Sequence, residues 1–197
     1  MPSPSEAESR LLLELARQAI TEAVLCEKRR LKSASGGIFL EKRGVFVTLH
    51  LRGRLRGCIG VVDACEPLRD AIARCAASAA LQDPRFSPVQ RREVADLQIE
   101  LSLLSQPEPI RPEEIEIGKH GLLISNGPRR GLLLPQVAVE HKFDRERFLE
   151  ETCTKAGLPP GAWRQPDTEI LGFTCEVFSE AEQPYTTPRT DDTAGAA

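Results

Sequence analysis

Leu55-Arg56-Gly57-Cys58-Ile59-Gly60 places one thiol between two glycines, two residues after an arginine. The segment follows Gly44–Leu51, whose β-branched and aromatic residues alternate with a period of two, as in a half-buried strand. Gly53 lies between the two segments and can adopt the positive φ that a tight turn needs. The sequence therefore predicts a β-hairpin with Cys58 on its returning strand, residues 55–62.

The length of the turn decides which side chains share a face with Cys58. A two-residue turn would put Arg56 and Cys58 on the apolar face of the first strand. A three-residue turn, 52–54, pairs apolar with apolar residues, and we prefer it because a slip of one residue moves every side chain to the other face. Its pairs are Leu51 with Leu55, Leu49 with Gly57, Val47 with Ile59 and Val45 with Val61. The face of Cys58 then also carries Phe46, Thr48, His50, Arg56 and Gly60.

Cys58 is the candidate nucleophile on this face. An adjacent guanidinium favours the thiolate, so Arg56 would activate Cys58 or hold an anionic substrate. His50 is a diagonal neighbour, roughly 7–8 Å away, and could act as a base. A weaker alternative is a metal site built from Cys58, His50 and Glu140.

The neighbours of Cys58 within the motif are candidate ligand-binding residues. Flanking glycines allow a ligand or another backbone to approach closely, which makes Gly57, Ile59 and Gly60 a candidate binding strand. The alternative is that Cys58 is only a small buried hydrophobic residue and that the glycines relieve crowding. Both interpretations stay open at the level of the sequence.

A second candidate segment is Asp83–Pro88. Its two prolines exclude a helix and predict a stiff loop. Asp83 and Arg85 can pair with each other, or Arg85 can point into a cleft and meet an anion, since a rigid loop positions a side chain well. The sequence does not decide between these roles.

A third candidate segment is Gly131–Val137. Its three leucines run into Pro135, which indicates a buried edge strand that ends or bulges there. Gln136 and Glu140 follow, and they either face the same cavity as Cys58 or satisfy local backbone groups. The residues alone leave both roles open; the family resemblance that these motifs carry favours the cavity, so both count as candidate binding residues.

The motifs resemble, in order, those of the AMMECR-type domain family, whose bacterial members are called AmmeMemoRadiSam system protein A. They are Leu55–Gly60, Asp83–Val89, Gly131–Val137, and Lys155–Leu158 followed by Trp163. The resemblance implies an α+β single domain with a mixed or antiparallel sheet flanked by helices, in two unequal lobes with a cleft between them. It implies no settled reaction. The bacterial group's name suggests partnership with a Memo-type protein, similar to extradiol dioxygenases, and with a radical-SAM protein.

Length and composition indicate one soluble domain. The chain has 197 residues, a formal net charge of -3 and a pI near 5.7, which argues against a general nucleic-acid binder. No apolar run approaches the ~20 residues that span a bilayer, so we expect no membrane association and a cytoplasmic location. We assign residues 5–180 to the domain and 181–197, which are polar and lack a periodic apolar face, to a disordered tail.

The cysteine pattern leaves Cys58 distinct. The six cysteines include no C-x-x-C pair, so we expect reduced thiols, no structural metal and no cofactor. Four are assigned to apolar faces, namely Cys26, Cys75, Cys153 and Cys175. Cys65 is assigned to a loop. Two functions follow: a small-molecule enzyme or enzyme component that uses a cleft around Cys58 and Arg56, or a non-catalytic binding or scaffold module that recognises a protein or metabolite there.

Overall fold

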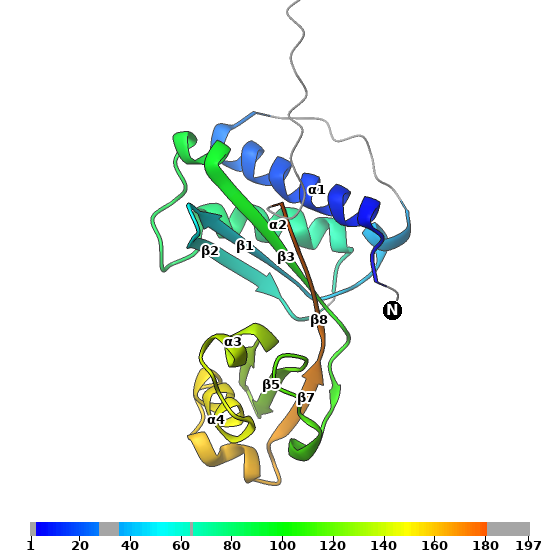
Figure 1. Cartoon of the computed structure of the whole chain (residues 1–197), viewed down its shortest axis with the longest axis vertical. Coiled ribbons are helices and arrows are strands. Elements are labelled where there is room, and N and C mark those ends of the chain that lie inside the picture. Colours follow the sequence, from blue (N-terminus) through cyan, green and yellow to red (C-terminus); the bar gives the residue numbers. More distant parts are fainter. Residues whose placement is uncertain (1–2, 28–35, 64, 181–197) are drawn as a thin grey trace, which may run out of the picture.

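Two four-stranded antiparallel sheets, each with helices packed on it, form the protein (Figure 1). The computed structural model describes residues 3–27, 36–63 and 65–180. Sheet A has the order β2-β1-β3-β8, and sheet B has the order β4-β7-β5-β6. The strands are β1 (Val45–Leu51), β2 (Arg54–Val61), β3 (Leu97–Leu104), β4 (Glu108–Pro109), β5 (Gly121–Asn126), β6 (Arg129–Leu133), β7 (Glu169–Phe173) and β8 (Cys175–Ser179). This arrangement confirms the predicted α+β class.

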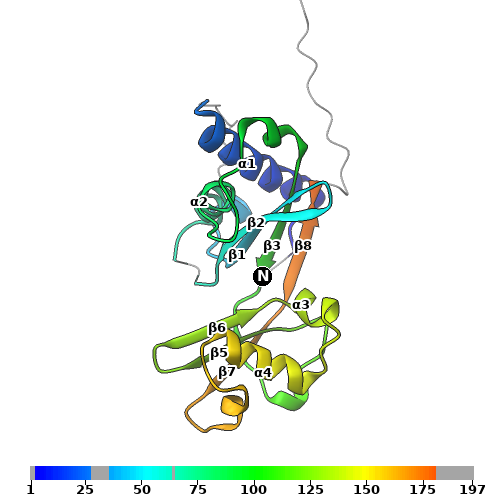
Figure 2. The same cartoon turned by 90° about the vertical axis from the view of Figure 1, so that its left-hand side faces the viewer.

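The helices divide between the two lobes (Figure 2). Helices α1 (Glu6–Leu25) and α2 (Leu68–Leu81) cover sheet A, while α3 (Pro135–Glu140) and α4 (Arg145–Lys155) belong to the lobe of sheet B. Four short 3-10 helices connect these elements: η1 (Gly37–Leu40), η2 (Arg91–Asp96), η3 (Pro112–Glu114) and η4 (Pro160–Arg164). Helix α3 was not predicted, because Pro135 was interpreted as the end of a strand although it occupies the first helical turn, where its missing donor is tolerated.

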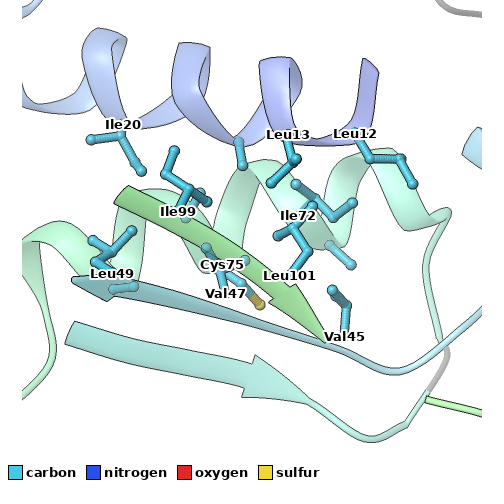
Figure 3. Close-up of a cluster of buried hydrophobic side chains, with 14 of the residues drawn as sticks. Leu12, Leu13, Ile20, Val45, Val47, Leu49, Ile72, Cys75, Ile99 and Leu101 are labelled. Carbon is cyan, nitrogen blue, oxygen red and sulfur yellow. The ribbon is translucent and has the colours of Figure 1, made fainter. Parts of the chain in front are cut away.

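The larger core lies between sheet A and helices α1 and α2 (Figure 3). Ser5 and Glu8 form the predicted capping box at the start of α1. Helix α2 turns a face of small residues to the sheet, and Cys75 on that face is fully buried, as predicted. Cys26 is an exception to the prediction: it is exposed, because the helix ends at Leu25 and Cys26 adopts a left-handed conformation with φ of 57°.

The β1–β2 hairpin corrects the predicted turn. Arg52 and Gly53 form a two-residue turn with φ of 52° and 74°, the positive values that match the twist of a hairpin. His50 therefore pairs with Leu55 and Leu51 with Arg54, so the predicted pair of Leu51 with Leu55 is wrong. A bulge at Arg56 then restores the predicted register: Leu49 pairs with Gly57, Val47 with Ile59 and Val45 with Val61.

The two sheets meet along one bent ribbon. Leu104 pairs with Cys175 in sheet A and Glu108 with Gly172 in sheet B, so the β3–β4 side carries one extra residue at the bend. The apolar alternation from Ile170 to Phe178 predicts a single last strand, but the structure has two strands in different sheets. Cys175 packs half-buried against the apolar cluster of Leu104, Leu123 and Phe173, in agreement with its assignment to an apolar face, whereas Val177 is 42% exposed.

Some predictions fall outside the described residues. The tail 181–197 is one of them. Another is the end of the first helix, because the helical spacing of apolar residues from Leu11 predicts a helix to about residue 29, and residues 28 and 29 are not described. Within the described part of the chain, no helix is long and apolar enough to cross a membrane. Cys153 on α4 is fully buried, as predicted.

Glu180 completes sheet A where β8 ends. Its carboxylate accepts a hydrogen bond from the backbone N–H of Ile99 at 3.0 Å and pairs with Arg17 of α1, Nε at 3.0 Å. The same guanidinium donates to the carbonyl oxygens of Val94 (2.7 Å) and Leu97 (2.6 Å). Glu180 thus ties α1, η2 and β3 together.

We expect E180A to lower the free energy of unfolding by about 1–3 kcal/mol, because it leaves the half-buried Arg17 guanidinium and the N–H of Ile99 without their carboxylate acceptor. The matched control is E27A, which removes the partner of Arg91 in a pair whose side chains are 73% and 44% exposed. The control should cost less than about 1 kcal/mol. Urea denaturation measures both, and equal losses would contradict the role given to Glu180.

Candidate functional site

Cys58 lies on the face of sheet A that is opposite helices α1 and α2, which we call the outer face. In the register of sheet A its members are Phe46, Thr48, His50, Cys58, Glu100, Ser102, Val177 and Ser179. Thr48 is directly across from Cys58, and its Oγ1 hydroxyl donates to the Cys58 Sγ atom at 3.3 Å. Cys58 is half-buried, so its thiol remains partly accessible.

Arg56 does not bind the thiol but holds a loop. Its Nε and Nη2 atoms donate to the carboxylate of Glu93, each at 3.1 Å. Nη1 donates to the carbonyl oxygen of Ser87 at 2.8 Å, and Nη2 donates to that of Pro88 at 3.2 Å. The hydrogen bonds from Arg56 are the main reason that the pKa of Glu93 is lowered. The expected partnership of Arg56 with Cys58 is replaced by one with residues 87–93.

Asp83 and Arg85 bind the backbone of Cys58. The N–H of Cys58 donates to Asp83 Oδ2 at 2.8 Å, and Arg85 Nη2 donates to the carbonyl oxygen of Cys58 at 3.2 Å. Arg85 also binds the Asp83 carboxylate through Nε (3.0 Å) and Nη2 (2.7 Å), and this contact holds the pKa of the buried Asp83 well below its usual range. The pair therefore occupies the open edge of β2 at Cys58.

The motif glycines make room for the protein itself. A Cβ atom on Gly57 would lie 2.2 Å from the carbonyl oxygen of Ala79, because the backbone of α2 packs directly on β2. A Cβ atom on Gly60 would lie 2.3 Å from the ring of Phe46. Ile59 packs against the core on the helix side. Of the two interpretations of these residues, the contacts agree with the relief of crowding.

Gln136 reaches the outer face at a distance from Cys58. Its amide and the Ser102 hydroxyl lie against the thiol of Cys175, whose pKa is raised by burial. The Oε1 atom of Gln136 is buried without a hydrogen-bond partner among the described residues. Ser102 lies two strands away from Cys58 and two residues beyond Glu100, which is in line with Cys58 across the sheet. This offset corresponds to roughly 12 Å between the Cα atoms of Ser102 and Cys58.

The remaining candidates stay apart from the thiol. Glu140 is exposed at the end of α3, and His50 makes no hydrogen bond to Cys58 within the described residues. No three His, Cys, Asp or Glu side chains among those residues gather closely enough to hold a metal ion, which argues against the Cys58–His50–Glu140 site.

Among the described residues, three cavities lie at the junction of the two sheets, and the walls of these three do not include Cys58 or Arg56. Their volumes are about 390, 490 and 450 Å³. Three residues make the hydrogen bonds to Cys58 described above. Arg85 was selected as a candidate site residue, whereas Thr48 and Asp83 were not. The register placed Thr48 on the correct face, but nothing in the local sequence indicated that Asp83 would reach the backbone of Cys58.

We expect G57A to lower the free energy of unfolding by about 2–3 kcal/mol, because a methyl group cannot fit against the backbone of α2 without moving the helix. G161A is the control: its Cβ would meet only Arg164 Nη1, at 3.7 Å, and should change stability by less than about 1 kcal/mol. Urea denaturation would compare them, and a well-tolerated G57A would contradict the close packing.

D83N should destabilise the protein at pH 7 by about 1–3 kcal/mol, because Arg85 loses its carboxylate. The folded-state pKa values of Asp83 and Glu93 are lowered, so the unfolded state takes up more protons in acid. The stability they contribute is present above the unfolded-state values of about 4 and is lost as the pH falls below them. The difference between wild type and D83N should therefore narrow from pH 6 to about pH 3.

Urea midpoints across this pH range measure the difference. D167N, at an exposed aspartate, is the control and should match wild type at each pH. A gap between wild type and D83N that stays constant with pH would contradict the ionised Asp83–Arg85 pair.

The comparisons with known proteins agree on one family. The AMMECR1 family model matches residues 13–178. A protein from Methanothermobacter thermautotrophicus is 45% identical over 184 residues, which covers 89% of this chain and 96% of that relative. A second relative, from Methanosarcina barkeri, is also 45% identical, with 90% of this chain and 93% of the relative covered.

A solved structure supports the fold as well. The crystal structure of an uncharacterised protein from Pyrococcus horikoshii aligns with a TM-score of 0.80 and 42% identity, over 87% of this chain and 90% of that one. These relatives are archaeal, so the narrower resemblance to the bacterial AmmeMemoRadiSam group stays a prediction. The family model, the two relatives and the solved structure together show that the chain belongs to the AMMECR1 family.

Proposed function

We propose that this protein is a binding module that recognises a metabolite or a peptide through the outer face of sheet A, with Cys58 as a contact residue. The observation that carries the proposal is that the motif's other groups already have structural partners. Arg56 binds Glu93, Gly57 accommodates Ala79, and the backbone of Cys58 binds the Asp83–Arg85 pair. The thiol accepts a hydrogen bond from the Thr48 hydroxyl and is the part of Cys58 that we propose meets a ligand.

The surroundings of the thiol suit recognition. The residues in line with Cys58 across the sheet are Thr48, Glu100 and Ser179, so hydroxyl and carboxylate groups cross the four strands. Phe46 in the next line packs against the apolar cluster of Leu104, Leu123 and Phe173 at the junction of the sheets, so it belongs to the fold. A strand face with a rigid backbone positions hydroxyl and carboxylate groups more accurately than a loop does. A polar ligand would match the line of Thr48, Glu100 and Ser179.

A second candidate function is a thiol-dependent enzyme component that works with Memo-type and radical-SAM partners. One observation favours it: the Thr48 hydroxyl donates to Sγ, and a hydrogen bond to the charged form favours a thiolate. Arg56 cannot assist in the way first expected while it is paired with Glu93. Arg85 is nearer to that role, because its Nη2 atom donates to the carbonyl oxygen of Cys58 at 3.2 Å.

The alkylation of Cys58 by iodoacetamide as a function of pH separates the two functions. A binding module predicts that the rate at Cys58 rises with pH in parallel with the rate at the exposed Cys65, both followed site by site by mass spectrometry. T48V, which keeps the shape of Thr48 but removes its hydroxyl, should leave this pH dependence unchanged.

The opposite result would overturn the proposal. Cys58 that reacts roughly tenfold faster than Cys65 at neutral pH, with the excess lost in T48V, would support an activated thiolate and the enzyme component. R85M is a further variant for that case, and its unfolding curve would show whether the fold survives the loss of the Asp83 partner.

A further inference from the structure

A cavity of about 390 Å³ separates the two sheets beside their connecting ribbon. One wall is formed by residues 42–44, which precede β1, and by residues 62–63, which follow β2. The other wall is the ribbon bend, residues 104–107, with Arg130 and Leu171 of sheet B. Its volume is in the range of small-molecule sites, roughly 300–1,000 Å³. This cavity is separate from the outer face, since Cys58 does not line it.

The charges in the cavity wall are mainly positive. Four charged side chains line it: Lys42, Arg43, Arg130 and Asp63. Arg130 binds both oxygens of Asp63, at 2.7 and 3.0 Å, so the one carboxylate of this wall is already neutralised. Lys42 is exposed, and no carboxylate of the described residues lies within 4.0 Å of its ammonium group. A cationic cavity is unexpected in a chain of formal net charge -3.

Arg43 belongs to the fold and not to the ligand. Its buried guanidinium binds Glu176 at 2.9 Å, and its Nη1 atom lacks a hydrogen bond. The Oε2 atom of Glu41 also lacks one and lies 4.0 Å from Nη1, so a small rotation would satisfy both groups. We therefore assign the unpaired Nη1 group of Arg43 to Glu41. Lys42 remains the cation without a partner among the described residues of this wall.

We infer that this cavity binds a small molecule through a carboxylate or phosphate group, with Lys42 as the contact residue and Arg130 as the second cation. The apolar part of the wall, Val62, Leu104, Pro107 and Leu171, would pack against the carbon skeleton of such a molecule. Lys42 supplies a mobile ammonium donor, while Arg130 is held in place by Asp63 and keeps N–H groups beyond those used in that pair. The site joins the two sheets and is independent of the function proposed for Cys58.

The test is a titration of the full, ¹⁵N-labelled chain with inorganic phosphate and, separately, with acetate, at ionic strength held constant with sodium chloride. We expect saturable shifts of the amide signals of Gly44, Ser105 and Gln106, which line the cavity. K42M should raise the dissociation constant about three- to fivefold, which corresponds to the loss of one exposed charge contact. D63N should lower the dissociation constant, because it removes the one carboxylate of the wall.

K119M is the control, because Lys119 is paired with Glu116 and does not line the cavity. Saturation with phosphate but not acetate would identify a phosphate ligand, and the reverse would identify a carboxylate ligand. The inference would be overturned if neither anion gave saturable shifts at these amides, or if K42M and K119M gave equal dissociation constants. Thermal unfolding of each variant would show that the fold is kept, and alkylation of Cys58 would report on the other site independently.

Discussion

The closed edge of strand β2 is the constraint on which the motif depends. An edge strand exposes backbone N–H and C=O groups that can pair with other chains. At Cys58 these groups are bound by Asp83 and Arg85. Arg56, which lies at the bulge two residues earlier, holds residues 87–93 in place through Glu93. The charged side chains of Arg56, Asp83 and Arg85, which are residue types common in catalytic sites, therefore stabilise the edge of β2.

The same constraint gives physical reasons for most of the motif. Arg56 is the unmatched residue of the bulge, which turns it toward the loop, and Gly57 lets the backbone of α2 contact the strand. Ile59 contributes to the core and Gly60 leaves room for Phe46. A family could keep this sequence for its packing alone. The Cys58 side chain, with a hydroxyl donor and partial exposure, has no packing reason of this kind.

Much of sheet A could be predicted because its signals are local. The alternation in β1 and the small-residue face of α2 follow from spacing, and two prolines identify the loop of Asp83. The turn was missed because Arg52 adopts a positive φ that its residue type does not favour. The pairing of Arg56 with Glu93, 37 residues away, had no local signal at all. The same holds for the contact of Gln136 with Cys175, which depends on how two lobes pack.

The bend between the sheets explains why one long apolar pattern was misread. Residues 170–178 alternate as a single strand would, but at Thr174 the ladder is interrupted, and the backbone N–H of Thr174 donates to the side-chain oxygen of Ser105 at 2.9 Å. A side chain has replaced a carbonyl acceptor, and the strand passes from one sheet into the other. Ser105 also lines the inter-sheet cavity, so the side chain that interrupts the ladder forms part of the cavity wall. A substitution at Ser105 would therefore act on the bend and on the cavity together, whereas Thr48 belongs to neither.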